Sequence, residues 1–217
     1  MIDKVGTYFS ELLFKFEILK KHSLETNLFL STRFSVFDYI YVDENRLSDI
    51  IADLLNPTGK HGQSDIFLNE FIKILNRKEL IERSFPKVNR EMGTSFISRT
   101  QRRMDILIEW TTHGIMIENK PWAEDQYEQI LDYKKNLEKR YGEKFIIVYL
   151  SKNYQNPSKE SISQNELENL IQKNQFLQIS FENELLLWIK NCIKESQSDK
   201  MRHFLKDFLT YLNDNFN

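Results

Sequence analysis

The sequence has little cysteine, proline and glycine: one, four and six residues among 217. The single thiol, Cys192, excludes an internal disulfide and a cysteine-rich zinc site. No apolar stretch approaches the roughly 20 residues of a membrane span. Asp3 and Glu11 also stand where a signal peptide would be basic and then apolar. We therefore expect a cytoplasmic protein without a membrane segment.

Charge is unevenly distributed along the chain, although the net charge is only −2. Residues 1–60 carry seven Lys or Arg and nine Asp or Glu, whereas residues 71–103 carry nine basic and three acidic residues. A basic segment suits the phosphate backbone of a nucleic acid, but it is also typical of a solvated surface. Both interpretations stay open on charge alone.

The spacing of apolar residues predicts helices at both ends of the chain and strands between them. Short β-rich segments begin at Val88 and are separated by turn residues, which indicates three consecutive strands. The polar segment 152–175 is expected to be a loop with one short helix. The predicted helices are 3–31, 43–55, 66–77, 122–141, 182–195 and 199–213, and the predicted strands are 88–97, 104–110, 115–120, 144–151 and 176–181.

This order of elements predicts an α/β fold: a mixed β-sheet core flanked by helices, with an N-terminal helical segment. The length is typical of one domain. Within it we expect a helical part over about 1–80, a sheet core over about 86–181 and C-terminal helices over 182–213. The sequence contains no internal repeat and no low-complexity tract.

A carboxylate and an ammonium stand two residues apart at the end of a predicted strand, in the stretch IENKPW. Because side chains alternate along a strand, Glu118 and Lys120 project from the same face. A hairpin loop over TTHG pairs positions whose numbers sum to 225, which puts Leu107 opposite Glu118 and Asp105 opposite Lys120. Asp105 then shares their face and lies diagonal to Glu118, roughly 7–8 Å away at the backbone.

Two carboxylates that converge beside an ammonium suit phosphodiester hydrolysis. Carboxylate oxygens bind Mg²⁺ or Mn²⁺, which neutralise phosphate charge and help generate a hydroxide nucleophile. A neighbouring lysine can orient or deprotonate the attacking water and stabilise charge in the transition state. The alternative is a salt bridge at the end of a strand, which contributes only about 0–1 kcal/mol if it is exposed.

Other residues favour the first interpretation. The triplet at 118–120 is the only Glu-x-Lys in the chain. Gln126, Gln129 and Tyr133 lie at spacings of three and four on the next predicted helix, so amides and a phenol share one stripe, although this is also typical of an amphipathic boundary. Glu44 lies on the apolar stripe of its helix, where a carboxylate is costly unless it is paired or near a metal. Its alternative role is that of a first-turn acid favoured by the helix dipole.

These residues resemble the PD-(D/E)xK nuclease superfamily, in its branch with a RecB-like Gln-x-x-x-Tyr motif. The matching pattern is Asp105, Glu118-x-Lys120 and Gln129-x-x-x-Tyr133. The blocks ENRLSDIIADLLNP, KHGQSDIFLNEFI, RRMDILIEW, IENKPWAEDQYEQILDY and ISFENELLLWI are similar, in that order, to those of a bacterial and phage-associated group. The resemblance spans about residues 40–190. Met104 departs from the proline of the family pattern, and the chain is short for the group, which leaves the choice of target open.

The resemblance implies a restriction-endonuclease-like core that binds one or two Mg²⁺ ions, with Mn²⁺ as a substitute. Asp105, Glu118 and the main-chain carbonyl of Asn119 would be the metal ligands. The implied partner is nucleic acid, with DNA expected, and the implied activity is that of a deoxyribonuclease. A homodimer or a partner protein stays possible, and the rival interpretation is a non-catalytic nuclease-like module that binds nucleic acid or a protein.

By the same resemblance, Lys120 would act on the nucleophilic water, while Gln129 and Tyr133 would support the lysine and the substrate phosphate. Glu44 would contribute through a water or a second metal. His61 falls in a shared block and is a candidate for the mouth of the active site, with a surface loop residue as the alternative.

Three arginines precede the predicted catalytic strand. Arg99, Arg102 and Arg103 are candidates for contacts with the phosphates of the substrate. A solvated β-turn is the equally weighted alternative.

Overall fold

The computed structural model describes residues 2–31, 34–81, 84–93, 103–122 and 125–216. The chain divides into two compact units, Met1–Tyr41 and Val42–Asn217, each described by itself below. The assignment of the whole chain to one nuclease-like domain stays a prediction.

The first unit contains the helix α1 (Ile2–Leu30) and the short 3-10 helix η1 (Val36–Asp38). Large apolar side chains of α1, such as Phe9, Phe16 and Leu19, are exposed. In the part of the chain that the structure describes, no helix is both long and apolar enough to cross a membrane.

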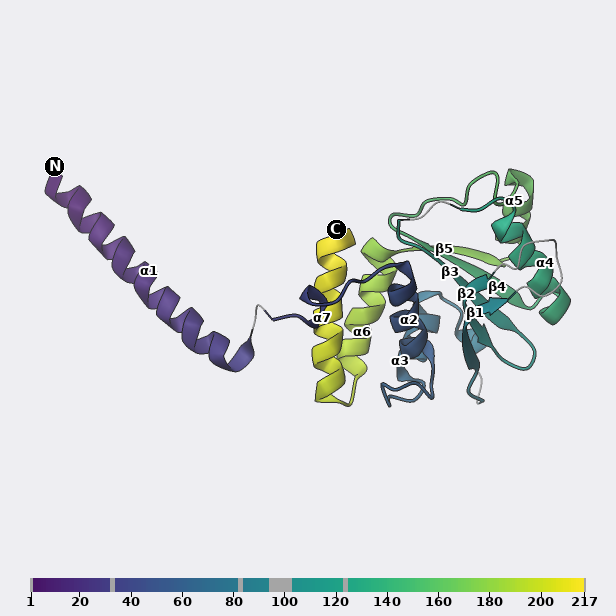
Figure 1. The fold of residues 1–217 in the computed structure, drawn as a ribbon, viewed down its shortest axis with the longest axis horizontal. Helices are drawn as coiled ribbons and strands as arrows, with labels where there is room; N and C mark the ends of the chain where they lie inside the picture. Colours follow the sequence, from purple (N-terminus) through teal and green to yellow (C-terminus); the bar gives the residue numbers. More distant parts are fainter. Residues whose placement is uncertain (1, 32–33, 82–83, 94–102, 123–124, 217) are drawn as a thin grey trace. The chain divides into compact units, whose positions relative to one another are not determined.

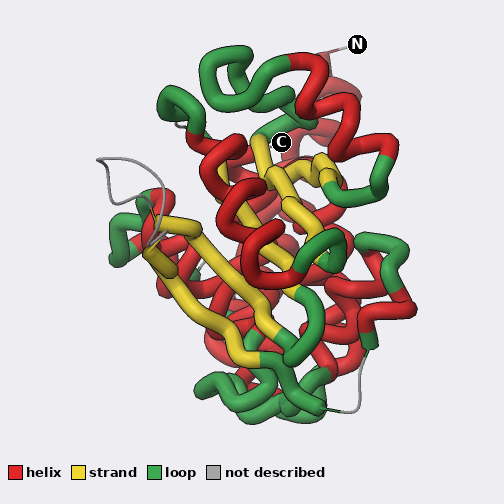
Figure 2. Tube along the Cα trace, turned by 90° about the vertical axis from the view of Figure 1, so that its right-hand side faces the viewer, coloured by secondary structure: helices red, strands yellow, loops and turns green. Residues whose placement is uncertain are grey.

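The second unit is built on one five-stranded sheet with the order β1-β2-β3-β4-β5 (Figures 1 and 2). The first three strands form an antiparallel meander, and β3, β4 and β5 run parallel. Parallel neighbours require crossover connections, and helices supply them here. The mixed sheet expected from the order of elements is confirmed. The strands are β1 (Lys87–Gly93), β2 (Arg103–Glu109), β3 (Gly114–Lys120), β4 (Phe145–Ser151) and β5 (Phe176–Ser180).

Helices cover both faces of this sheet (Figure 1). On one face lie the two crossover helices, α4 (Gln129–Tyr141) and α5 (Gln164–Gln172). The other face carries helices from both ends of the unit, which explains why β3 and β4 are buried along their whole length. Of these, α2 (Glu44–Leu55) contacts the strands, α3 (Ile66–Ile74) packs on α2, α6 (Leu186–Glu195) packs on α3, and α7 (Asp199–Phe216) packs on α6. The 3-10 helix η2 (Lys78–Leu80) follows α3 in the chain, and the π-helix η3 (Phe181–Leu185) leads into α6.

The helix α2 shows how the sequence sets an element that later carries a site residue. Asp43 caps it by accepting a hydrogen bond from the Arg46 N–H at 2.8 Å, as its position before the apolar pattern predicts. Leu47, Ile51 and Leu55 are fully buried at spacings of four. The helix ends at Leu55, because Asn56 precedes a proline and adopts an extended conformation.

The crossover helices enclose an apolar cluster against the sheet. Leu107 of β2, Met116 of β3 and Ile147 of β4 belong to it, together with Tyr133 of α4. Because side chains alternate along a strand, Glu118 continues the face of Met116 and points towards α4. The adjacent Asn119 points to the opposite face, where α2 lies.

Two predicted boundaries need correction. The helix predicted over 122–141 begins only at Gln129, because Glu128 has a left-handed backbone (φ 54°) that a right-handed helix cannot include. Of the helix predicted over 182–195, the first residues form the π-helix η3. The strand predicted over 88–97 is described as far as Gly93, and the rest of it lies outside the described residues.

Candidate active site

The register of the β2–β3 hairpin differs from the predicted one by two residues. Ile106 pairs with Ile117 and Glu109 pairs with Gly114, so paired numbers sum to 223. The four-residue loop starts one position earlier than expected, because the Trp110 N–H donates to the carbonyl of His113 at 3.0 Å and the two rings stack at 4.6 Å. The predicted pairing of Asp105 with Lys120 is therefore wrong.

An even shift leaves the faces of the strands unchanged. Continuing the observed register by one pair places Asp105 directly opposite Glu118 rather than diagonal to it. The Asn119 N–H donates to Oδ2 of Asp105 at 2.9 Å, which holds this carboxylate against β3. Asp105, Glu118 and Lys120 thus share one face, as the alternation predicts.

Glu118 is almost completely buried, with 1% of its surface exposed. Its Oε1 accepts hydrogen bonds from Nε2 of Gln129 at 2.6 Å and from Nζ of Lys120 at 3.0 Å. Its Oε2 is buried without a hydrogen-bond partner among the described residues. Burial, followed by the negative charge of Asp105, raises the pKa of Glu118 well above its ordinary value. A buried oxygen of this kind needs a cation or a proton.

Asp105 and Glu44 complete the carboxylate cluster around Glu118, and both are also destabilised as anions. Burial raises the pKa of Asp105, against the opposing hydrogen bond from Asn119 and the charge of Lys120. Burial also raises the pKa of Glu44, which reaches the cluster from the N-terminus of α2. Three acidic side chains thus lie near Lys120, with Arg90 as a second positive charge that acts on Asp105 and Glu44, and burial still raises the pKa of each carboxylate.

Lys120 is the cation among these carboxylates. Its Nζ lies 3.0 Å from Oε1 of Glu118 and 3.9 Å from Oε1 of Glu44. Burial lowers the pKa of Lys120, but the attraction of Glu118, Glu44 and Asp105 outweighs it, and the net direction is upward. The lysine is therefore an ammonium at neutral pH in the metal-free protein.

The first turn of α4 supports Glu118 through two side chains. Nε2 of Gln129 also approaches the Tyr133 hydroxyl at 3.0 Å, and this hydroxyl donates to the carbonyl of Arg103 at 2.8 Å. The remaining amide oxygen of Gln129 accepts from the Gln126 N–H at 3.0 Å. Every polar atom of the Gln129 side chain is used, so Gln129 and Tyr133 form a fixed support for the carboxylate. Gln126, which was predicted to share their stripe, precedes α4, is exposed and contributes only its backbone N–H.

Contacts that were not predicted hold α2 and β1 against the same strands. Asn119 donates from Nδ2 to Oγ of Ser48 at 2.8 Å and to the carbonyl of Glu44 at 3.3 Å. Arg90 donates to the carbonyl of Asp105 and, at 2.9 Å, to the carboxylate of Asp49. A serine on the apolar stripe of α2 was a usable signal in the sequence, whereas nothing in the pattern distinguishes Arg90 from other basic residues.

The remaining candidates lie apart from the carboxylates or outside the described residues. His61 is buried in its own loop, where Nε2 donates to the carbonyl of Asn56 at 2.8 Å and Nδ1 accepts from the Gln63 N–H at 3.0 Å. Both ring nitrogens are thus used locally, which favours a role in shaping the loop, and its contact with nucleic acid stays a prediction.

The three candidate arginines are only partly placed. Arg103 is exposed and pairs with Glu91 at 2.7 Å, so its side chain lies at the surface beside β1. Arg99 and Arg102 lie outside the described residues. The role of all three in phosphate binding stays a prediction.

The donor set fits a hard divalent cation. Within the described ranges, no group of three His, Cys, Asp or Glu side chains forms a metal cage. Mg²⁺ does not need one, because it is usually held by one or two carboxylates and keeps several waters. Asp105 and Glu118 supply two carboxylates, and the unpartnered Oε2 of Glu118 is the observation that a cation would explain. The carbonyl of Asn119 is a third oxygen on the same segment.

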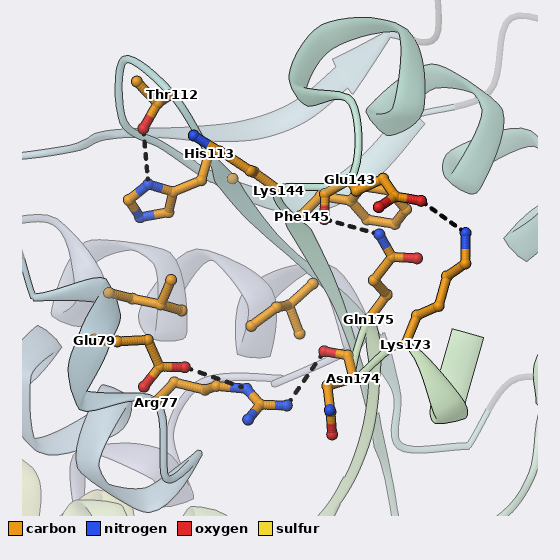
Figure 3. Close-up of a pocket in the computed structure, with 13 residues that line it drawn as sticks. Arg77, Glu79, Thr112, His113, Glu143, Lys144, Phe145, Lys173, Asn174 and Gln175 are labelled. Carbon is orange, nitrogen blue, oxygen red and sulfur yellow. Dashed lines mark hydrogen bonds and ion pairs between the residues drawn. The ribbon is translucent and has the colours of Figure 1, made fainter. Parts of the chain in front are cut away.

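A cavity lies at the opposite end of the sheet from the carboxylates (Figure 3). It has a volume of about 500 Å³ and is lined by the β2–β3 hairpin at His113, by the start of β4 and by the turns after α3 and α5. Two of its basic groups are engaged with neighbours: Lys173 with Glu143 at 2.8 Å, and Arg77 with the carbonyl of Asn174 at 3.2 Å. It shares no residue with the carboxylate cluster.

Comparison with known families assigns the chain to a class of proteins. A family model described as the PD-(D/E)XK nuclease superfamily matches residues 34–210. The chain therefore belongs to the PD-(D/E)XK nuclease superfamily, which confirms the resemblance seen in the sequence and points to nuclease activity. No curated protein and no solved structure matches the chain.

Proposed function

We propose that the protein is a Mg²⁺-dependent deoxyribonuclease that hydrolyses phosphodiester bonds of DNA by direct attack of water. The observation that carries this proposal is the buried Glu118 carboxylate, which lies close enough to Asp105 to be affected by its charge, bonds to Lys120 and has one oxygen without a partner among the described residues. A buried oxygen without a partner costs about 1–3 kcal/mol, and an ion bound at Oε2 would offset that cost.

The residues of the cluster would have separate roles in metal binding and in activation of water. Asp105, Glu118 and the carbonyl of Asn119 would hold the ion, which when bound neutralises phosphate charge and activates water. As an ammonium, Lys120 orients the attacking water by donating a hydrogen bond from Nζ, and it stabilises the charge that develops on the phosphate oxygens.

Other side chains keep this group in place. Gln129 fixes Oε1 of Glu118, and Tyr133 anchors Gln129 to β2. Glu44 lies close enough to Lys120 to act on its charge or, through a water, on a second ion. A non-catalytic module would have no need of this complete and mutually bonded set, which is why we favour the enzyme.

The direct test is incubation of the pure protein with Mg²⁺ or Mn²⁺ and a panel of linear, circular, duplex and single-stranded DNA, with matching RNA. We expect cleavage of at least one DNA substrate that stops when EDTA is added. Persistence of every substrate, or cleavage that continues in EDTA, would contradict the proposal.

Metal binding is expected to stabilise the fold. At about 100 times its dissociation constant, Mg²⁺ or Mn²⁺ should add about 2.7 kcal/mol to the free energy of unfolding, which raises the melting temperature by roughly 5–10 °C. Asp105→Asn should remove this rise. Asp207→Asn, which changes a half-buried aspartate on α7, should keep it. An equal rise in both variants, measured by calorimetry, would place the ion elsewhere.

A further inference from the structure

Trp122 is an exposed aromatic residue beside the carboxylate cluster. It follows Lys120 by two residues, so roughly 7 Å of chain separate their Cα atoms. Of its surface, 53% is exposed, whereas Trp110 and Trp188 are buried. A large indole left half open at the end of the central strand is unusual, because such rings normally bury most of their apolar surface.

The indole of Trp122 packs against other aromatic rings. Trp122 stacks on Phe216 with centroids 5.5 Å apart and an angle of 21° between the ring planes. Phe216 stacks in turn on Phe181 at 4.2 Å and 18°. Both phenylalanines are fully buried. The indole therefore rests on a rigid support, and its exposed part is ready to accept a further flat ring without loss of side-chain entropy.

The same support is linked to the segment that carries Glu44. The Tyr211 hydroxyl on α7 donates to the carbonyl of Val42 at 3.3 Å, two residues before Glu44. The C-terminal turns of α7 thus contact both the start of α2 and Trp122. A group stacked on the indole would lie at the rim of the site rather than at a remote surface.

We propose that Trp122 is the stacking platform for an unpaired nucleobase, and that the site acts on single-stranded DNA. The inference rests on the proposed nuclease function. Bases in a duplex are stacked on each other and do not present a face to a protein side chain, whereas single-stranded DNA is bound by aromatic side chains that stack on successive bases. A base adjacent to the scissile phosphate can reach the indole because Lys120 and Trp122 are so close in the chain.

Tryptophan fluorescence tests this directly, because Trp122 is the exposed one of the three tryptophans. The full chain with Lys120→Met keeps its carboxylates and should not cut, so binding can be measured with Mg²⁺ present. Titration with a single-stranded oligonucleotide should quench the emission. A closed circular duplex should quench it much less. With Trp122→Phe added, the quenching should vanish, while the anisotropy of a labelled oligonucleotide should show affinity within about three-fold, because a phenyl ring still stacks.

Trp122→Ala in the same background should weaken single-strand binding roughly ten-fold or more and leave duplex binding unchanged. Tyr154→Ala, which removes another half-exposed ring, is the matched control and should change neither. Absence of quenching, unchanged single-strand affinity in Trp122→Ala, or an equal loss for single strand and duplex would each overturn the inference.

Failure of the nuclease proposal would look different. None of these readouts needs cleavage, so a wild-type chain that cuts no DNA with Mg²⁺ or Mn²⁺ would refute the proposed function even if Trp122 is quenched. Conversely, a chain that cuts DNA while Trp122→Ala binds and cuts single strands as the wild type does would refute only the stacking platform.

Discussion

Replacing Glu118 with Gln or Lys120 with Met should reduce metal-dependent cleavage of DNA at least about 10³-fold, because each change removes a group that acts at the reacting phosphate. Glu118→Gln removes a charge that would hold the ion. Lys120→Met keeps the length of the side chain and removes the ammonium that lies 3.0 Å from Glu118. Initial rates of cleavage with Mg²⁺ and Mn²⁺ measure the loss.

The chain offers controls with the same chemistry elsewhere. Glu70 is a buried carboxylate that pairs with Lys73 on α3. Lys134 of α4 is a partly buried lysine that pairs with Glu166 of α5. Glu70→Gln and Lys134→Met should therefore keep wild-type rates. Circular dichroism would check that all four variants are folded. Cleavage at the wild-type rate by either site variant would end the claim that the cluster is catalytic.

The alternation of side chains was enough to predict which residues share a face. Asp105, Glu118 and Lys120 meet on one surface although the predicted register was wrong by two residues, because only the parity of the pairing decides the face. The exact register depends on where the hairpin loop closes. Here the stacking of Trp110 on His113 decides it, and no propensity of the strands encodes that contact.

Support of the site from distant segments could not be predicted in the same way. Arg90 bonds to Asp105 and Asp49 across 15 and 41 residues of chain, so its role depends on how β1 and α2 pack. The sequence predicts Trp122 to be the first residue of a helix, whereas it precedes α4 and stacks on Phe216 near the end of the chain. Local periodicity contains no information about such contacts, which form only when the sheet and its helices assemble.

In the absence of metal, Glu118→Gln should be more stable than the wild type at pH 7 to 8. The pKa of Glu118 is raised even though Lys120 lies at 3.0 Å, so burial and the charge of Asp105 outweigh the attraction of the lysine. The carboxylate is therefore a net cost to the folded state when it is ionised. Relief of that cost should be on the order of 1–3 kcal/mol, or roughly 3–8 °C in melting temperature.

The direction in which Glu118 changes the free energy of unfolding with pH follows from its raised pKa. Between the ordinary pKa of 4.5 and the raised value in the folded protein, the folded state binds more protons than the unfolded state. The contribution of Glu118 to stability is thus fully present below pH 4.5 and is lost as the pH rises through the raised pKa. Glu118→Gln lacks this loss, so its advantage should be small at pH 4 and grow towards neutral pH. Urea unfolding in EDTA across this range measures the difference.

Saturating Mg²⁺ should make the wild type more stable than Glu118→Gln, because the ion stabilises only the chain that keeps the carboxylate. If Glu118 and Lys120 instead formed a salt bridge at the end of a strand, the opposite results are expected. Glu118→Gln would remove the negative partner of Lys120 and would be less stable than the wild type at neutral pH. Metal would then change the stability of the variant and of the wild type equally. Glu70→Gln is the control for such a bridge and should be no more stable than the wild type at neutral pH, because it removes the partner of Lys73 on the same helix. Whether Glu118→Gln raises or lowers the free energy of unfolding at neutral pH in EDTA therefore distinguishes a cation-binding site from a salt bridge at the edge of the sheet.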